Sequence, residues 1–92
     1  MNENGNPKRI DILVINDEAE VPSLLNPMTG KIFVTNSVGK HIVQLADGTL
    51  SFEAIVDEVA AHFKGAPVEL IREEARLFLE QGRAAGLIEW AA

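Results

Sequence analysis

The sequence predicts a small α+β domain in which a three-stranded antiparallel sheet is followed by three helices. Up to Asn36 the apolar residues alternate with a period of two, and beyond it they recur every three or four residues, as on a helix face. The 92 residues, 47% of them hydrophobic, suffice for one compact core but not for two. A chain in which strands come first and helices follow is typical of the α+β class.

Three strands are expected in the first third of the chain. Residues 1–8 are polar and rich in Asn, so we expect a disordered tail there. RIDILVIN, residues 9–16, is rich in β-branched side chains and is expected to form one strand. VPSLLNP, residues 21–27, contains two prolines, which lack a backbone donor, so this strand should be short and at a sheet edge. KIFVTN, residues 31–36, is the third expected strand.

Three helices are expected in the rest of the chain. Asn36 or Ser37 can cap the first helix, and Asp47-Gly48 ends it, because glycine readily takes the left-handed conformation that follows a helix. Pro67 suits the first turn of the third helix, which should run to about Ala85. The expected apolar faces are Val38, Ile42 and Leu45 in the first helix, Phe52, Ile55, Val56, Val59 and Phe63 in the second, and Val68, Ile71, Ala75, Phe78, Leu79 and Gly82 in the third.

The third helix has more than one patterned face. Leu70, Leu77 and Ala84 form a second apolar stripe, which indicates that this helix has another neighbour beside the core. LIEW, residues 87–90, is expected to pack back on the domain. A third stripe is basic and lies at helical spacing from acidic residues, so its simplest interpretation is a solvated face: Arg72, Arg76 and Arg83 with Glu69, Glu73 and Glu80.

Composition and charge restrict the functions that the chain can have. There is no cysteine, which excludes disulfides, thiolate metal sites and cysteine nucleophiles. No apolar run approaches the roughly 20 residues that span a bilayer, and the N-terminus lacks a secretory signal, so we expect a cytoplasmic protein without membrane contacts. The net charge of −6 argues against nucleic-acid binding, because that affinity comes mainly from neutralising phosphates with Lys and Arg.

The residues that could carry catalysis form no recognisable site. His41 and His62 lie on different expected helices, and neither has a Ser or a carboxylate at motif spacing. The adjacent carboxylates Asp57-Glu58 and Glu73-Glu74 diverge on a helix, so neither pair can work as an acid and a base. The glycines are scattered and make no phosphate-binding loop. We therefore expect no enzyme activity, no metal and no cofactor.

The order of these elements resembles a known family. LLNPMTGKIFVTNSVGKHIVQLADGTLSFEAIVDEVAAHF, followed by VELIREEARLFLEQGRAAGLIEW, is similar to the family of PqqD, the coenzyme PQQ synthesis protein D. The resemblance extends from about Ile10 to Trp90, and two positions depart from it: Thr35 stands where Leu is usual, and Gly39 where Ala is usual. The elements that carry it are Leu24-Leu25, Pro27 to Gly30, Val34-Thr35-Asn36, Ile42 to Leu45, Asp47-Gly48, Ile55-Val56, Phe78-Leu79 and Gly86-Leu87.

The resemblance implies a winged-helix-like peptide-recognition domain over residues 9–92. Proteins of this type bind the leader of a ribosomally made precursor peptide and present it to a modifying enzyme, often a radical-SAM enzyme. The leader is expected to add as a strand to the edge of the third strand and to lie against the third helix. The residues that these two elements would contribute are Lys31, Ile32, Phe33, Val34 and Thr35, with Leu70, Arg72, Glu73, Arg76 and Leu77.

The residue types fit such a site, since Leu70 and Leu77 would form an apolar wall and Arg72 and Arg76 would meet guest carboxylates. Two other interpretations stay open. A winged-helix DNA-binding regulator would use the arginines of the third helix, although the glutamates of that helix would repel phosphates. A homo-oligomerising adaptor, for example a homodimer, would pair the exposed strand edge with a second copy.

Overall fold

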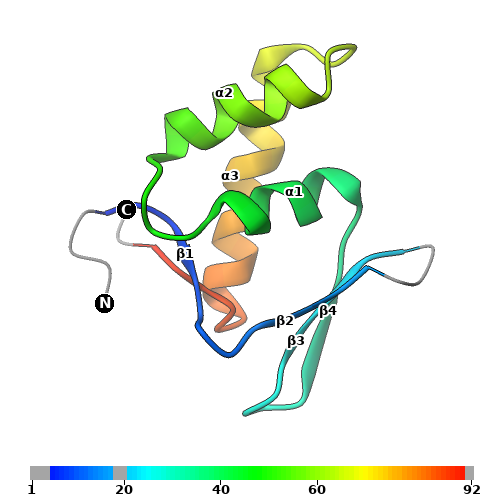
Figure 1. Cartoon of the computed structure of the whole chain (residues 1–92), viewed down its shortest axis with the longest axis vertical. Coiled ribbons are helices and arrows are strands. Elements are labelled where there is room, and N and C mark those ends of the chain that lie inside the picture. Colours follow the sequence, from blue (N-terminus) through cyan, green and yellow to red (C-terminus); the bar gives the residue numbers. More distant parts are fainter. Residues whose placement is uncertain (1–4, 18–20, 91–92) are drawn as a thin grey trace.

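The computed structural model describes residues 5–17 and 21–90. It confirms the expected α+β class: a three-stranded antiparallel sheet in the order β2-β3-β4 precedes three helices, and a second sheet pairs β1 with β5. Helices α1 and α2 lie across α3, with the three-stranded sheet to one side (Figure 1). In chain order the elements are β1 (Lys8–Arg9), β2 (Val14–Asn16), β3 (Ser23–Asn26), β4 (Lys31–Val34), α1 (Ser37–Leu45), α2 (Phe52–His62), α3 (Val68–Ala84) and β5 (Ile88–Glu89).

The first expected strand is in fact two strands in two different sheets, so the prediction of one strand over residues 9–16 was wrong. β1 pairs with β5, and the chain then turns, with the Leu13 N–H donating to the Ile10 carbonyl at 3.1 Å, before β2 pairs with β3. The break follows from the partners of β1: the Arg9 N–H donates to the Ala46 carbonyl and the Ile10 N–H to the Leu87 carbonyl. These bonds hold the start of the segment against the helices, whereas β2 belongs to the three-stranded sheet.

The strand between the two prolines is central, not at an edge as the sequence predicts. β3 pairs with β2 on one side and with β4 on the other. Both prolines lie just outside its four residues, so the ladder loses no donor. Pro22 contributes only its carbonyl, which accepts from the Thr35 N–H at 2.9 Å, and Pro27 is in the turn that follows Asn26. The argument from proline holds inside a strand and does not apply to residues that flank one.

The expected tail is part of the domain wherever the structure describes it, which corrects the prediction for residues 5–8. Pro7 is fully buried, and its carbonyl accepts from the Gly48 N–H at 3.1 Å. The Asn6 side chain donates to the Gly48 carbonyl at 3.1 Å, and Lys8 pairs with Glu89 in the β1–β5 sheet. Residues 1–4 lie outside the described part of the chain. The Asp47-Gly48 corner between α1 and α2 is therefore held by the N-terminal segment.

Arg9 closes the C-terminal end of α1 from the same segment. Its Nη1 lies 3.2, 3.1 and 3.4 Å from the carbonyl oxygens of Val43, Gln44 and Ala46. The last carbonyls of a helix have no intrahelical partner and carry partial negative charge, so a guanidinium there supplies both donors and a favourable charge. At the opposite end, the Asn36 side chain accepts from the Gly39 N–H at 2.9 Å, which confirms Asn36 as the cap.

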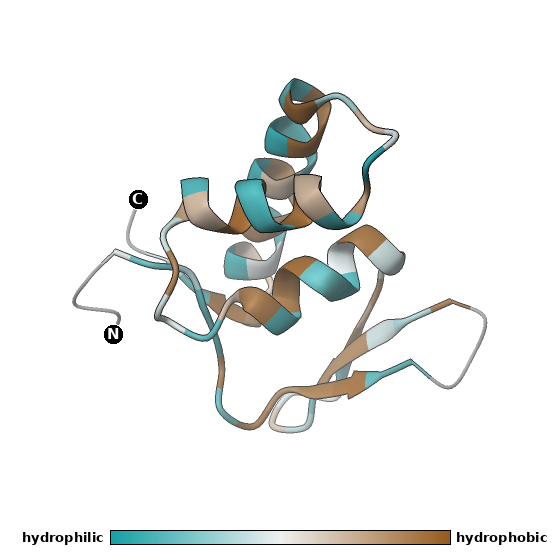
Figure 2. Ribbon diagram, turned by 45° about the horizontal axis from the view of Figure 1, so that its top comes forward, coloured by the Kyte–Doolittle hydropathy of each residue, from teal (hydrophilic) through white to brown (hydrophobic). Residues whose placement is uncertain are grey.

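One hydrophobic core joins the helices to β3 and β5, and hydrophobic residues run along the helices and strands (Figure 2). The expected faces of α1 and α2 are buried at Ile42 and at Ile55, Val56 and Val59, whereas the expected core position Val68 of α3 is 45% exposed. The C-terminal segment packs back as predicted: Leu87 is buried, and Trp90 stacks on Phe52 with ring centroids 5.4 Å apart. The residues that the core buries in α3 are Ile71, Ala75, Leu79 and Gly82.

At Gly82 the side chain of Ile88 in β5 lies close against the backbone of α3. A Cβ atom at this position would lie 2.7 Å from Cγ1 of Ile88, closer than side chains tolerate.

None of the helices in the described residues is long and apolar enough to cross a membrane.

Replacing Arg9 by alanine should lower the free energy of unfolding by about 1–2 kcal/mol, because three carbonyls at the end of α1 lose a charged donor. Urea unfolding followed by circular dichroism measures the change. Lys64→Ala, on an exposed loop, is the matched loss of one cation and should change stability by less than about 0.5 kcal/mol. Equal effects of the two substitutions would show that Arg9 does not hold the helix end.

Candidate functional site

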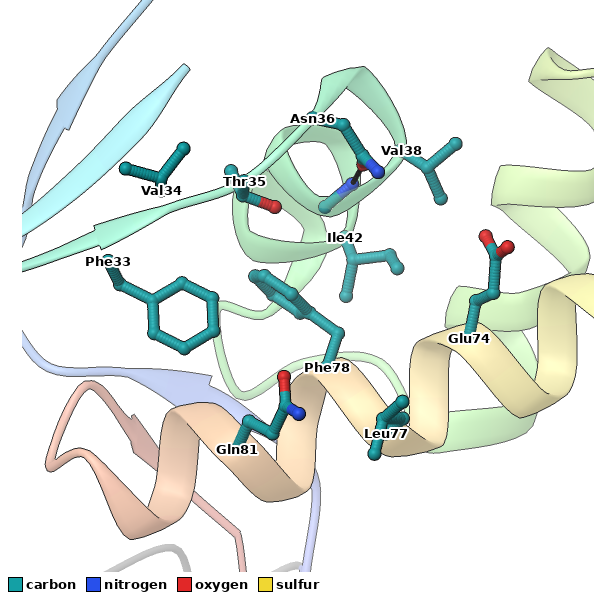
Figure 3. A pocket seen from close by; sticks show the side chains of 11 residues that line it. Phe33, Val34, Thr35, Asn36, Val38, Ile42, Glu74, Leu77, Phe78 and Gln81 are labelled. Atoms are coloured by element: carbon teal, nitrogen blue, oxygen red, sulfur yellow. Dashed lines mark hydrogen bonds between the residues drawn. The ribbon is translucent and has the colours of Figure 1, made fainter. Parts of the chain in front are cut away.

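A groove of about 390 Å³ lies between the end of β4, the start of α1 and one side of α3. Figure 3 shows the two walls facing each other, with the β4–α1 segment on one side and α3 on the other. The first wall consists of Phe33, Val34, Thr35, Asn36, Val38, Gly39 and Ile42, and the second of Glu74, Leu77, Phe78 and Gln81. Most of these side chains are apolar or uncharged, so the groove suits an apolar guest with a polar backbone.

Two aromatic rings connect the walls. Phe33 of β4 and Phe78 of α3 meet edge to face, with centroids 5.7 Å apart and planes at 89°. This is a favourable arrangement for two aromatic rings, worth about 0.5–1.5 kcal/mol beyond the area that they bury. The contact sets the distance between strand and helix at the end of the groove next to Gln81 (Figure 3).

The wall formed by α1 requires a glycine. A Cβ atom at Gly39 would lie 1.8 Å from Oγ1 of Thr35 and 3.0 Å from Cε1 of Phe78. Thr35 and Gly39 are the two positions at which the sequence departs from the PqqD pattern, and the structure brings them into contact. The two departures are therefore coupled, because the Thr35 hydroxyl occupies the space that an alanine at position 39 would need.

β4 is bonded on one side only within the described part of the chain. It pairs with β3 in the register Ser23–Val34 to Asn26–Lys31, and β3 is the only neighbour that the sheet order shows for it. The Thr35 N–H donates to the carbonyl of Pro22, the residue opposite it, so Thr35 bonds toward β3, with one bond only because proline has no N–H. Because bonded and non-bonded pairs alternate in an antiparallel sheet, Phe33 also bonds toward β3, while Ile32 and Val34 direct their N–H and C=O groups to the open edge.

The strand residues expected at the site fall into two sets. Phe33, Val34 and Thr35 line the groove. The side chains of Ile32 and Val34 are 67% and 66% exposed, and they project to the sheet face opposite Phe33, since successive side chains of a strand alternate. Lys31 is exposed at the far end of β4. Ile32 and Val34 can therefore contribute main-chain groups to a guest on the groove side, and their side chains remain outside.

The expected residues of α3 are divided as well. Leu77 lines the groove and is 58% exposed. Leu70 lies two turns earlier on the same stripe, is 47% exposed and is outside the groove lining, as is the exposed Glu73. The second apolar stripe of α3 thus points to the groove side at Leu77 and continues past its end at Leu70.

The structure does not bring Arg72 and Arg76 to the groove. Arg72 donates to Glu53 of α2 at 2.9 Å and to Glu69 at 2.8 Å. Its hydrogen bond holds the pKa of the Glu53 carboxyl below the usual value. The Arg76 guanidinium lies 5.1 Å from the centroid of the Phe52 ring. Both side chains face α2, because their positions are about 200–240° around the helix from Leu70, at about 100° per residue.

Glu74, Phe78 and Gln81 are groove residues that the sequence argument missed. Phe78 was expected in the core, and its half-buried ring belongs to both places. The helical spacing could have found the other two: Leu70, Glu74, Leu77 and Gln81 follow one another at three or four residues and so share a face. The apolar residues alone drew attention to Leu70 and Leu77 and left the polar members of the same stripe aside.

The two histidines lie together, away from the groove lining. The rings of His41 and His62 stack at 4.4 Å with planes 17° apart, and Phe63 packs edge-on against both. Burial lowers the pKa of His41, and His62 and Lys40 lower it further, while Glu58 has the opposite effect. Within residues 5–17 and 21–90 no three His, Asp or Glu side chains gather into a candidate metal site, and the stacked pair connects α1 with the end of α2.

Comparison with known proteins agrees with the fold. Over residues 23–88 the chain matches the family model described as Coenzyme PQQ synthesis protein D (PqqD). The chain belongs to the PqqD family. In three dimensions the chain is similar to the solved structure of TbiB1 in complex with the TbiA(beta) leader peptide. The TM-score is 0.75 and the sequence identity 27%, over 92% of this chain and 98% of that chain. None of the curated proteins matches it.

Gly39→Ala should destabilise this PqqD-family domain in the natural background but much less when Thr35 is also alanine. The new methyl group meets the Thr35 hydroxyl at 1.8 Å, whereas alanine is otherwise favoured over glycine in a helix by about 1 kcal/mol. Urea unfolding of both single variants and the double variant gives the coupling energy, expected at about 0.5–3 kcal/mol for residues in contact. Additive effects would show that the two positions are independent.

Between pH 7.5 and 5.5 the domain should lose more stability than its His41→Gln variant. The pKa of His41 is lowered in the folded state, so the unfolded chain takes up its proton more readily. The contribution of this group is therefore complete above the ordinary value of 6.5 and is lost as the pH falls through that value toward the lowered folded pKa. Urea unfolding at both pH values tests this, and equal losses in the two proteins would contradict it.

Proposed function

We propose that this chain binds the leader of a ribosomally made precursor peptide by β-strand addition and presents it to a modifying enzyme. The observation that carries the proposal is the open edge of β4, which lies directly beside the apolar groove of α3. An extended peptide can satisfy the unpaired main-chain groups of such an edge. Main-chain pairing is indifferent to sequence, so the groove must supply the specificity.

The register of β4 determines which parts of a guest would meet which residues. Main-chain bonds would form with Ile32 and Val34, the two residues whose N–H and C=O groups face outward. Guest side chains opposite Phe33 and Thr35 would point toward α3, into the groove, and those opposite Ile32 and Val34 would lie on the outer face. Two alternate guest side chains would therefore be buried against Phe33, Phe78 and Leu77.

Apolar contacts would provide most of the affinity. Burying two Leu-sized guest side chains contributes about 1.5–3 kcal/mol each. Association and the ordering of a flexible peptide cost several kcal/mol, so a dissociation constant in the micromolar to high-nanomolar range is expected. Such an affinity suits a protein that must release its peptide to an enzyme.

Two comparisons support this function over the alternatives. The family is named for a protein of coenzyme PQQ synthesis, and TbiB1, a structural relative over nearly the whole chain, is in complex with a leader peptide. We propose a radical-SAM enzyme or another peptide-modifying enzyme as the recipient of the leader, and a carrier role without catalysis for the chain itself. A homodimer formed through β4 would use the same main-chain groups, and it would therefore compete with the peptide.

The contacts of α3 do not favour the DNA-binding alternative. Arg72 and Arg76 are engaged with α2, and Arg83 donates to the Trp90 carbonyl at 3.1 Å. The net charge of −6 would oppose the approach of phosphates. A DNA-binding regulator would need a basic face on this helix, whereas these arginines contact other parts of the same chain.

Val34→Pro should abolish leader binding while Val34→Ala largely preserves it. Both variants lose the same exposed side chain, but only proline removes the N–H that faces the open edge. The measurement is an NMR titration of isotope-labelled protein with a peptide that the intact chain has enriched from a displayed random library. Circular dichroism should show both variants folded, because that N–H makes no bond to β3. Undiminished binding by folded Val34→Pro would exclude strand addition at this edge.

A further inference from the structure

We propose that the groove selects a leader in which a Lys or Arg lies two residues from an apolar anchor, with Glu74 as the partner of the cation. This proposal rests on leader binding to β4 and adds the chemistry by which the leader is chosen. It also reverses the charge expected of the guest, because the sequence predicted that arginines of α3 would meet guest carboxylates. The reason for the change is the distribution of charge around the groove.

The groove contains one ionisable side chain. Of its eleven lining residues, Glu74 alone is charged, and the other polar members are the neutral Thr35, Asn36 and Gln81. Asn36 already uses its side-chain oxygen to cap α1. Glu74 is therefore the residue through which this groove can distinguish guests by charge.

The nearby cations are directed elsewhere. Arg72 and Arg76 face α2, and Lys40 of α1 lies 3.4 Å from Asp17. Among residues 5–17 and 21–90 no cation forms an ion pair with Glu74. Its carboxylate is thus available to a guest, and the adjacent Glu73 is exposed and adds negative potential at the same end.

The position of Glu74 along the groove sets the spacing. In Figure 3 Phe33 and Gln81 lie at one end, Phe78 lies between the walls, and the Glu74 carboxylate points from α3 toward Val38 at the other end. A guest side chain opposite Phe33 meets the aromatic rings. The next side chain on the same face is two residues away along the strand, opposite Thr35, on the side where Glu74 lies.

The long side chains of Lys and Arg fit this second place. Their methylene stems can lie along apolar surface while the charged head reaches a carboxylate, and Leu77 and Val38 supply that surface beside Glu74. An acidic guest residue there would meet Glu74 in a protein that carries a net charge of −6. Discrimination would therefore come from attraction of one charge and repulsion of the other.

Selection from a random library of displayed 12-residue peptides, on the intact chain and in parallel on Glu74→Gln, tests the proposal even while the natural leader is unidentified. The expected result is enrichment of an apolar residue with Lys or Arg at a spacing of two on the natural protein. Glu74→Gln should retain the apolar preference and lose the basic one. Glu80→Gln, which removes the same charge from an exposed position of α3 outside the groove lining, is the matched control and should keep both preferences.

Titration of one selected peptide gives the magnitude. Replacing its basic residue by Glu should weaken binding about five- to tenfold on the natural protein, as for loss of one ion pair plus like-charge repulsion. Glu74→Lys should reverse the order of the two peptides. Enrichment of apolar residues without a basic neighbour, or with an acidic one, overturns the charge selection and leaves leader binding intact. A peptide bound at the β4 edge is recognised by its loss of binding to Val34→Pro. If no such peptide is enriched, both the charge selection and leader binding at β4 are overturned.

Discussion

The arrangement depends on a strand that is hydrogen-bonded on one side only. β4 is the last strand of its sheet, and the chain leaves it through Thr35 and the helix cap Asn36, so α1 begins before the chain could return along the open edge. The core places α3 beside that edge, and the contact between Phe33 and Phe78 sets the gap. Main-chain groups of Ile32 and Val34 consequently point to an open edge that borders the groove at Val34. A peptide at such an edge can gain both backbone bonds and buried side chains.

The shape and the charge of the groove come from different parts of the chain. The wall formed by α1 depends on the close approach of Thr35 and Gly39, because the Thr35 hydroxyl occupies the space next to the glycine. The charge of the groove depends on Glu74, while Arg72 and Arg76 of α3 contact Glu53 and Phe52 of α2. Helix α3 thus separates its contacts by face: one side holds α2, one side is buried in the core, and one side faces the groove.

Much of the fold could be predicted from the sequence, since the change of hydrophobic period at Asn36 separates strands from helices. The break between β1 and β2 could not, because the bonds that cause it go to Ala46 and Leu87, far along the chain. Periodicity also cannot distinguish a central from an edge strand. At the site, the strand edge and Leu77 followed from resemblance and pattern, whereas the directions of Arg72 and Arg76 depend on α2, a neighbour that the spacing along α3 does not reveal.

Residue-resolved amide hydrogen exchange, with and without saturating leader peptide, tests strand addition most directly. In the free protein the amides of Ile32 and Val34 should exchange quickly and those of Phe33 and Thr35 slowly, because only the latter bond toward β3. Leader binding should slow Ile32 and Val34 strongly and change Phe33 and Thr35 little. If the peptide binds and Ile32 and Val34 still exchange at the rate of the free protein, the leader does not pair with β4.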